Sequence, residues 1–307
     1  MGKIAYKETR FSAASEARIH QANVILAEYQ DKGFDLTLRQ LYYQFVARGL
    51  IDNNQREYKN LGSLVNDARL AGRIDWNSIV DRTRDLRGRP HWANPADIVK
   101  ACAQSFSIDL WEGQPVRPEV WIEKDALVGV IEPVCRSLDV SYFSCRGYVS
   151  QSEMHEAAHD RIAPRESEDQ RTVILHLGDH DPSGIDMTRD IEDRLLMFGC
   201  NDLEVLRIAL TMEQVQEFNP PPNPAKLSDA RAQGYVDKYG DESWELDALS
   251  PETIAELITK HVASCLKNPA LHKKMLKREK DMKASLAKTS KHWPSVETYV
   301  KTLKDLK

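Results

Sequence analysis

The stretch Leu175-His176-Leu177-Gly178-Asp179-His180-Asp181-Pro182-Ser183-Gly184 decides how the centre of this 307-residue chain is interpreted. An apolar run over residues 173–175 leads into it and is typical of a buried parallel strand. A glycine then interrupts the strand, and a Pro-Ser-Gly turn leads to a helix expected over residues 185–197. Because alternate side chains at a strand end point to the same face, Asp179 and Asp181 should both face one cleft.

Paired carboxylates at a strand end have two readings. The first is an ordinary polar loop with an Asp-Pro turn. The second is a cation site, because two close carboxylates repel and a hard divalent ion removes the repulsion. A third acid, Glu123, ends an earlier apolar strand. If the two strands are neighbours, Glu123, Asp179 and Asp181 converge beyond their carboxyl ends, where they would hold one or two Mg²⁺ ions, with Mn²⁺ as the alternative.

The composition, 41% hydrophobic and 29% charged, is typical of a soluble chain with about two domains. No apolar run approaches the ~20 residues of a membrane span, and the N-terminus lacks the apolar core of a signal peptide. Five cysteines without a C-x-x-C pair fit reduced thiols better than a disulfide framework or a zinc site. We therefore expect a cytoplasmic protein that does not enter a membrane.

The net charge of −5 is unevenly distributed along the chain. Basic residues outnumber acidic ones by 4 over residues 1–100 and by 9 over residues 260–307. Acidic residues are in excess by 10 over residues 101–200 and by 8 over residues 201–259. Basic ends around an acidic middle suit a protein whose ends bind phosphates and whose centre binds a cation, although a solvated helix face would also explain the Lys-rich end.

Three helices are expected near the N-terminus, over residues 12–31, 38–48 and 57–70. Thr37 is the expected N-cap of the second, and glycines follow all three. With a short extended segment at residues 74–76, this order resembles a winged helix-turn-helix. The architecture is common, so the spacing alone does not establish DNA binding.

An arginine-rich stretch completes this N-terminal, winged-helix-like domain, which we assign to residues 1–110. Guanidinium groups fork onto phosphate oxygens, and the following Trp92 is able to stack on a base. The stretch is therefore a candidate nucleic-acid contact, and a linker paired with nearby acids is the alternative. Its four arginines are Arg82, Arg84, Arg87 and Arg89.

From Pro118 the pattern changes to strands that alternate with helices. The expected strands cover residues 119–123, 141–144, 172–177 and 203–208, and the expected helices between them cover 126–138, 152–162 and 185–197. This alternation implies right-handed crossovers and a mostly parallel sheet with flanking helices. We assign residues 111–259 to this α/β domain and residues 260–307 to a basic helical tail.

Four segments together carry a more specific pattern. They are Val120-Trp121-Ile122-Glu123-Lys124, Arg146-Gly147-Tyr148, Gly178-Asp179-His180-Asp181-Pro182-Ser183-Gly184 and Trp244-Glu245-Leu246-Asp247-Ala248-Leu249. They resemble the TOPRIM domain of the A subunit of type IIB topoisomerases (topoisomerase VI) and of the related meiotic double-strand-break protein. The resemblance implies a Mg²⁺ site at Glu123, Asp179 and Asp181, with Glu123 also acting as general acid/base.

The same family carries a nucleophilic tyrosine upstream, in an Arg-Asp-aliphatic-Tyr-Tyr motif. This chain has Leu38-Arg39-Gln40-Leu41-Tyr42-Tyr43, where Gln40 replaces the usual acid. By resemblance, Tyr43 attacks the DNA phosphodiester to form a phosphotyrosyl link, and Arg39, one turn earlier on the same helix face, steadies the phosphate. The alternative is that Tyr42 and Tyr43 are core residues of the helix.

The resemblance thus implies Mg²⁺-dependent DNA cleavage, with an A-subunit homodimer and a separate ATPase B-type subunit as partners. The sequence has no glycine-rich nucleotide loop, so complete topoisomerase activity by this chain alone is not expected. Two alternatives use the same residues. One is a TOPRIM nuclease with metal-activated water and no covalent link, and the other is a DNA-binding module with an inactive metal site.

A rival motif points to different chemistry. His155-Glu156-Ala157-Ala158-His159 satisfies H-E-x-x-H, which on a helix turns two imidazoles toward one zinc ion. A zinc protease would need a further ligand, for which Glu192 is the candidate. Charged neighbours indicate a surface crossover helix instead. His176 and His180 flank the aspartates, and lone histidines of this kind are more often structural than ligands.

Overall fold

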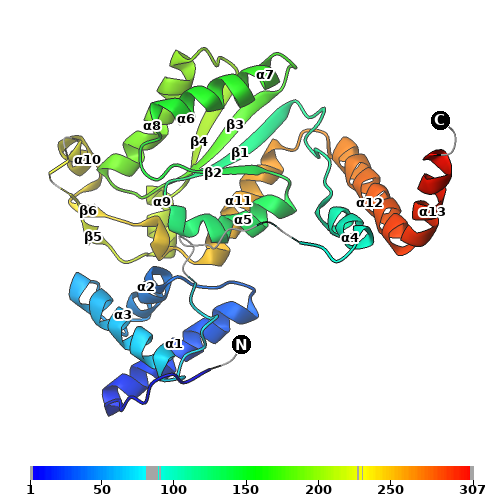
Figure 1. Cartoon of the computed structure of the whole chain (residues 1–307). Coiled ribbons are helices and arrows are strands. Elements are labelled where there is room, and N and C mark those ends of the chain that lie inside the picture. The colour runs from blue at the N-terminus through cyan, green and yellow to red at the C-terminus, as the bar shows by residue number, and fades with distance from the viewer. Residues whose placement is uncertain (1–2, 81–88, 90, 227, 230, 305–307) are drawn as a thin grey trace. The chain divides into compact units, whose positions relative to one another are not determined.

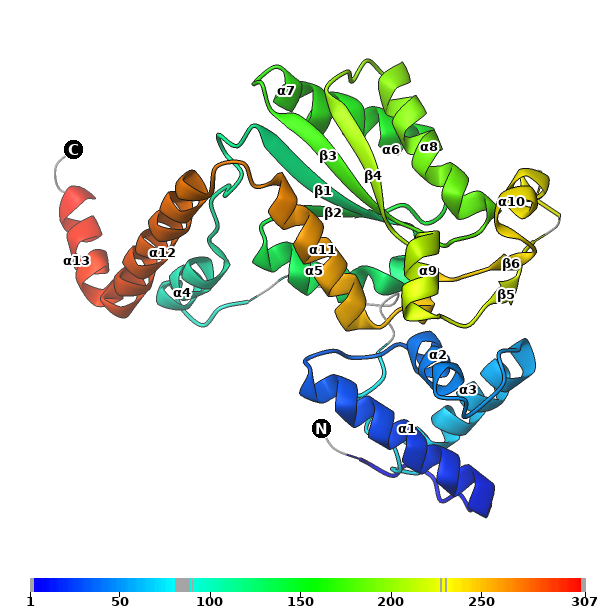
Figure 2. The same ribbon diagram turned by 180° about the vertical axis from the view of Figure 1, so that it is seen from behind.

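The computed structural model describes residues 3–80, 89, 91–226, 228–229 and 231–304. These residues form two compact units. The first contains residues up to 80 together with Pro118–Cys265, and the second contains the described residues from 89 to Arg117 together with Leu266 onward. Figures 1 and 2 show the chain from opposite sides. No helix in these ranges is long and apolar enough to cross a lipid bilayer.

A four-stranded sheet forms the centre of the first unit. Its strands are β1 (Val116–Ile122), β2 (Ser141–Ser144), β3 (Arg171–Leu177) and β4 (Leu203–Ala209). All four are parallel and lie in the order β2-β1-β3-β4. An α/β fold with a parallel sheet is therefore confirmed. Because β1 and β3 are neighbours, the residues that follow them, Glu123 and Gly178 onward, leave the sheet at the same edge.

Helices cover both faces of this sheet (Figures 1 and 2). One face carries α5 (Val128–Ser137) and α11 (Pro251–Cys265), and the other carries α6 (Gln151–Glu156), a π-helical turn (Ala157–Ile162), α7 (Ala163–Glu166) and α8 (Pro182–Met197). The π-helical turn interrupts the regular helix expected over residues 152–162. It accompanies the placement of two arginines over the buried Glu119 of β1, with Arg165 Nη1 at 2.6 Å and Arg161 Nε at 3.6 Å.

The N-terminal helices α1 (Ala13–Asp31), α2 (Leu38–Ala47) and α3 (Gln55–Leu70) share a core of their own. The helices expected from the sequence are confirmed here to within two residues. Thr37 caps α2 as expected, and it forms a capping box in which Gln40 donates its backbone N–H to Thr37 and accepts from the Thr37 N–H. Gln40, the departure from the family motif, thus keeps the capping function of an acid. A winged-helix identity stays a prediction.

The segment between β4 and α11 closes over the edge of the sheet. It contains α9 (Met212–Phe218), β5 (Asn223–Pro224), α10 (Ala232–Tyr239), β6 (Glu242–Ser243) and a 3₁₀ turn (Leu246–Ala248). β5 and β6 pair antiparallel, and the residue after β6, Trp244, exchanges two backbone hydrogen bonds with His180. The loop that carries the two aspartates is therefore pinned by a distant part of the chain.

The second unit is helical and consists of α4 (Pro95–Ser105), α12 (Pro269–Lys291) and α13 (Trp293–Lys304). α4 packs along α12. α11 runs across the predicted boundary at residue 259 without a break, because its buried positions Ile254, Ile258 and Val262 recur at helical spacing against the first unit's core. The predicted three-part division of the chain stays a prediction.

Candidate active site

The structure brings Glu123 and Asp179 into direct contact. Glu123 follows β1, and its backbone N–H donates to the Leu177 carbonyl at 2.8 Å. Its carboxylate Oε2 accepts the backbone N–H of Asp179 at 2.9 Å. Asp181 lies close enough that its charge also raises the pKa of Glu123. The convergence of the three acids at one sheet edge follows from the adjacency of β1 and β3.

Positive charge only partly offsets burial and mutual repulsion at this acidic edge. Burial and the neighbouring Asp179 carboxylate raise the pKa of Glu123 to about 7. Burial also raises the pKa of Asp179, and the Lys124 ammonium opposes that rise. Glu123 can therefore exist in both protonation states near neutral pH, which is the range in which a general acid/base works best.

The raised pKa of Glu123 predicts how folding stability changes with pH in metal-free buffer. The folded state holds the Glu123 proton more tightly than the unfolded chain, whose glutamate pKa is 4.5. The stabilisation is complete below pH 4.5 and is lost as pH rises to about 7, by an amount on the order of 3 kcal/mol. Urea unfolding in EDTA at several pH values measures this slope, and Glu123→Gln should flatten it. An unchanged slope in the variant would contradict the assignment.

Asp181 lies at the acidic edge and also stabilises the start of α8. It is the N-cap of α8, where its Oδ1 accepts the Gly184 N–H at 2.7 Å and the Ser183 hydroxyl at 3.0 Å. The glycine is required because a Cβ there would overlap the Asp179 carbonyl oxygen and lie 3.0 Å from its carbon. The Asp-x-Asp-Pro-Ser-Gly spacing thus folds the two acids and the start of α8 onto one another.

Gly184→Ala should consequently disturb the acidic edge. Overpacking against a backbone carbonyl is expected to cost about 1–3 kcal/mol. A matched control is Gly234→Ala, because no atom lies within 4 Å of a Cβ at this position of α10. There the exchange should be neutral or stabilise by up to about 1 kcal/mol. Thermal melts of the two variants measure the contrast, and equal melting temperatures would show that the Asp179 backbone moves freely.

Lys124 lies partly buried within a cluster of acids. Its Nζ lies 2.9 Å from Asp179 Oδ1, 2.8 Å from Glu245 Oε2 and 3.4 Å from Asp247 Oδ2. These three carboxylates raise the pKa of Lys124 despite burial, so the amine stays charged. The 3₁₀ turn Leu246–Ala248 adds a backbone contact, since the Leu246 N–H donates to Asp179 Oδ1 at 2.8 Å.

Two of these acids, Glu245 and Asp247, also bind Arg39 of α2. Arg39 Nε lies 2.9 Å from Asp247 Oδ2, and its Nη2 contacts Glu245 Oε2. Glu245 and Asp247 therefore join Arg39 to Lys124, and Lys124 joins them to Asp179. This ion-pair chain connects the predicted tyrosine helix with the predicted metal edge inside the first unit.

Tyr43 lies beside this chain of charges. The residue is 3% exposed and belongs to the N-terminal core, and the Arg39 guanidinium lies 5.8 Å from the ring centroid. Burial and the Glu245 charge raise the pKa of Tyr43 to about 12, while a hydrogen bond with Asn223 lowers it. A pocket of about 300 Å³ opens next to it, and its lining includes Arg39, Tyr42, Tyr43, Asn53, Asn223 and Glu245.

Tyr42 has a different environment from Tyr43. Its hydroxyl donates to Asn53 Oδ1 at 3.0 Å and to the Asn54 carbonyl at 3.2 Å. Its ring meets the Tyr58 ring edge-on, with the centroids 5.2 Å apart. Tyr42 is thus held by structural contacts, whereas Tyr43 borders both the pocket and the ion-pair chain.

Several residues of the site were not assigned a role from the sequence. Three of them, Lys124, Glu245 and Asp247, lie inside the quoted motifs. Their charge was the only feature in the sequence that could have indicated a role. Arg207 of β4 had none. Its guanidinium donates to the carbonyls of Gly178 and Gly184 at 2.9 and 2.8 Å and also contacts the Asp179 carbonyl. It clamps the aspartate loop, and burial lowers its pKa to about 10.

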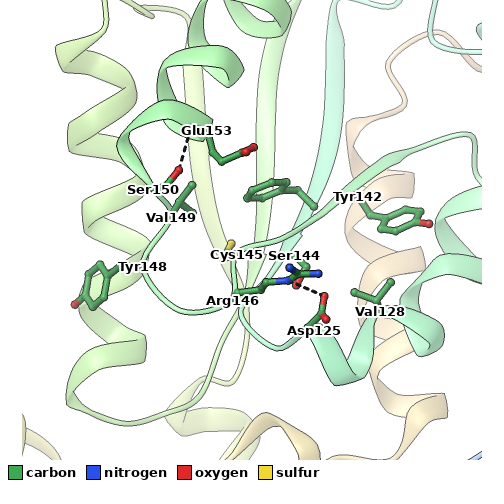
Figure 3. Close-up of a pocket in the computed structure, with 11 residues that line it drawn as sticks. Asp125, Val128, Tyr142, Ser144, Cys145, Arg146, Tyr148, Val149, Ser150 and Glu153 are labelled. Carbon is green, nitrogen blue, oxygen red and sulfur yellow. Dashed lines mark hydrogen bonds and ion pairs between the residues drawn. The ribbon is translucent and has the colours of Figure 1, made fainter. Parts of the chain in front are cut away.

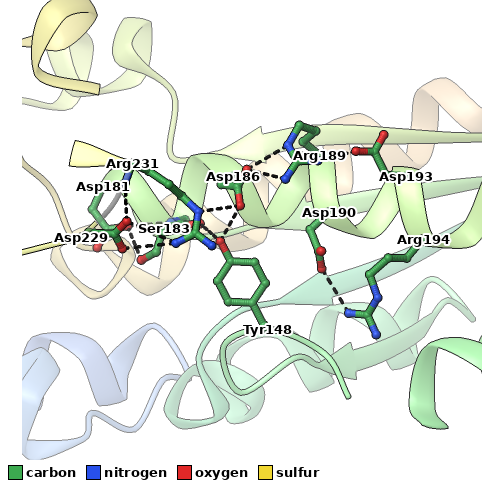
Figure 4. Close-up of polar contacts among 11 residues, drawn as sticks. Tyr148, Asp181, Ser183, Asp186, Arg189, Asp190, Asp193, Arg194, Asp229 and Arg231 are labelled. Carbon is green, nitrogen blue, oxygen red and sulfur yellow. Dashed lines mark hydrogen bonds and ion pairs between the residues drawn. The ribbon is translucent and has the colours of Figure 1, made fainter. Parts of the chain in front are cut away.

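The turn Arg146-Gly147-Tyr148 borders a second pocket, of about 570 Å³, beyond the end of β2 (Figure 3). Arg146 Nε lies 3.2 Å from Asp125 Oδ1. Tyr148 points the other way, toward α8, where its hydroxyl donates to Asp186 Oδ2 at 2.7 Å (Figure 4). Arg231 stacks over the Tyr148 ring and also binds Asp186, so this motif fixes the start of α8 and the segment before α10.

The histidines have mainly structural contacts. Burial lowers the pKa of His176 to about 3 and that of His180 to about 4, so both are neutral at pH 7. His180 Nδ1 lies 2.7 Å from the Tyr235 hydroxyl. His155 and His159 are exposed and lie with ring centroids 4.3 Å apart, next to Phe198.

Among the residues that the structure describes, no group of three or more His, Cys, Asp or Glu side chains has the arrangement of a metal site. This applies to the three acids and to the H-E-x-x-H segment alike. At the acidic edge, the Lys124 ammonium stands against Asp179 and Asp181 caps α8. The predicted nucleic-acid contacts Arg82, Arg84 and Arg87 lie outside the described residues, and Arg89 is exposed.

Comparisons with known proteins assign no family. No protein-family model matches the sequence. The search of the curated proteins also gives no match.

Proposed function

We propose that this chain is a metal-dependent enzyme that breaks DNA phosphodiester bonds, related to the TOPRIM-containing A subunit of type IIB topoisomerases. The observation that supports this most directly is the continuous ion-pair chain from Asp179 through Lys124 and Glu245 to Arg39, which borders Tyr43. A nucleophile and an acidic edge in one unit are what transesterification requires.

The three carboxylates at the edge are the kind of donor that a hard divalent cation prefers, although they are not arranged as a metal site in the structure. Glu123 and Asp179 have raised pKa values, which is the behaviour of carboxylates that need positive charge. Both offer oxygen ligands, as Asp181 does, and Mg²⁺ or Mn²⁺ prefers such ligands. When bound, the ion would supply Lewis-acid stabilisation of charge on a phosphate. Lys124 would then share Asp179 with it and keep its bonds to Glu245 and Asp247.

In the proposed reaction, the Tyr43 hydroxyl attacks phosphorus. An O–P bond to tyrosine forms, the O–P bond to the deoxyribose breaks, and the leaving oxygen takes up a proton. Arg39 would contact the phosphate from the pocket beside Tyr43. Glu123, with a pKa of about 7, is suited to give or take a proton. DNA is the substrate, and a second copy of the chain and an ATPase subunit are the proposed partners.

A hydrolytic nuclease is the second candidate, and the burial of Tyr43 favours it. A hydroxyl with a pKa of about 12 inside a core is a poor nucleophile unless the substrate changes its surroundings. In this alternative, a metal-activated water replaces Tyr43 and no covalent link forms. None of the five cysteines, all of them described, forms a disulfide bond, which fits a cytoplasmic setting for either enzyme.

Incubation of the purified protein with supercoiled plasmid and Mg²⁺ or Mn²⁺, followed by protease digestion, tests the proposal. Nicked or linear DNA should appear with the metals and be absent in EDTA. If the protein binds DNA but the plasmid stays intact with every divalent metal, the chain is a DNA-binding module and not a cleaving enzyme. Stoichiometric zinc that is lost in His155→Ala would instead favour the protease alternative.

A further inference from the structure

One face of α12 carries a row of five exposed lysines, here called the lysine stripe. Its members are Lys273, Lys277, Lys280, Lys288 and Lys291. At about 100° per residue these positions fall within an arc of roughly 80°, so they share one side of the helix. With a rise of 1.5 Å per residue, the stripe is roughly 27 Å long.

The opposite face of α12 packs against the rest of the second unit. Met275 is buried, and Leu271 lies against Gly113. Glu279 Oε2 accepts the Ile108 N–H at 3.2 Å, and the Ser290 hydroxyl donates to the Ala96 carbonyl at 2.8 Å. These contacts fix the rotation of α12 (Figure 1) about its axis, and the five lysines of the stripe are exposed.

The lysine stripe is not neutralised within the described ranges. None of its ammonium groups lies within ion-pair distance of a described carboxylate, whereas Lys283, on the packed side, binds Glu279 at 2.6 Å. The acidic residues of α12 are Glu279, which is engaged, and Asp281, at the margin of the stripe. Like charges three or four residues apart on a helix repel, so the row costs stability unless a polyanion meets it.

We propose that the lysine stripe docks on the phosphate backbone of duplex DNA. Its length approaches one turn of B-DNA, about 34 Å, and phosphates recur along that backbone at short, regular intervals. Lysines act as point charges on phosphates and read no base edges, so binding should be independent of sequence. An anionic membrane fits less well, because such a helix needs a broad free apolar face, and on α12 Met275 is buried while the exposed large apolar side chains are Leu276 and Met282.

This inference deepens the proposed function and rests on it for the choice of DNA. Binding to the stripe nonetheless needs neither Tyr43 nor the acidic edge. Duplex binding measured in EDTA, where no cleavage occurs, therefore tests the stripe by itself. Failure of the catalytic proposal would leave stripe-dependent binding in EDTA unchanged, whereas failure of this inference would give equal binding by the wild type and a variant without the stripe charges, so the two failures give different results.

The test is fluorescence anisotropy with a labelled 20-base-pair duplex at several salt concentrations between 50 and 200 mM, using the full chain. The variant Lys273→Gln/Lys280→Gln/Lys291→Gln removes three of the five charges, at both ends and in the middle of the stripe, and keeps helix propensity. The slope of log K against log salt should fall by about 2.7, at about 0.9 per contact. Affinity near 100 mM salt should then fall by at least tenfold. Circular dichroism checks that the helix content is unchanged.

The matched control is Lys100→Gln/Lys226→Gln/Lys260→Gln, which removes three exposed lysines outside the stripe. Its slope should stay at the wild-type value. Equal loss in both triple variants would attribute binding to net charge and overturn the inference. It would also be overturned if the stripe variant lost binding to phosphatidylserine vesicles while its duplex slope stayed unchanged. A tenfold preference of the wild type for duplex RNA would likewise reject DNA as the occupant.

Discussion

Tyr43→Phe is expected to abolish any covalent protein–DNA adduct while the chain stays folded. The exchange removes one hydroxyl and leaves the ring in the core formed by α1, α2 and α3. It removes the hydrogen bond with Asn223 and the only atom of this side chain that can attack phosphorus. Removing the nucleophile of a covalent mechanism lowers the rate by at least about 10³-fold. Denaturing electrophoresis of end-labelled plasmid after protein trapping measures the adduct.

Tyr42→Phe is the matched control for this prediction. It also removes one phenolic hydroxyl, at the neighbouring position of α2, but that hydroxyl donates to Asn53 and Asn54. Loss of these bonds should cost about 1–2 kcal/mol in stability and leave the adduct in place. If Tyr43→Phe still cleaves DNA, and neither this variant nor the wild type forms an adduct, the hydrolytic nuclease is correct. If Tyr42→Phe alone loses the adduct, the nucleophile has been assigned to the wrong tyrosine.

Local sequence patterns were sufficient to predict the helices and strands that hold this site. The apolar runs before Glu123 and Asp179 became the adjacent strands β1 and β3, and Thr37 became the cap of α2. Strand order was the missing step, because periodicity shows which residues are buried and does not show which strands pair. The order β2-β1-β3-β4 is what places Glu123 beside Asp179.

Long-range ion pairs account for most of what the sequence did not reveal. Arg39 and Glu245 are 206 positions apart, and Lys124 and Asp247 are 123 apart. No spacing rule connects such pairs, since each depends on how whole elements pack. Arg207 is a similar case. Nothing in the sequence singled it out, and only the approach of the aspartate loop to β4 turns it into a clamp on the carbonyls of Gly178, Asp179 and Gly184.

Asp179→Asn should remove metal-dependent cleavage, by about 10³-fold or more if the ion stabilises the transition-state charge. The asparagine retains an oxygen that can accept the Leu246 N–H, so the fold around the 3₁₀ turn should survive. The exchange also removes one of the charges that raise the pKa of Glu123. A second readout is independent of activity: saturating Mg²⁺ or Mn²⁺ should raise the melting temperature of the wild type and not that of the variant.

The control for this substitution is Asp193→Asn on α8. Asp193 is exposed and contacts Arg189, away from the edge, so its loss should change neither cleavage nor metal-dependent melting by a measurable amount. Two results separate the roles of Asp179. Lost cleavage together with lost metal stabilisation supports a metal ligand. Lost cleavage with metal stabilisation intact would mean that Asp179 acts through Lys124, because the ion-pair chain to Arg39 begins at this carboxylate.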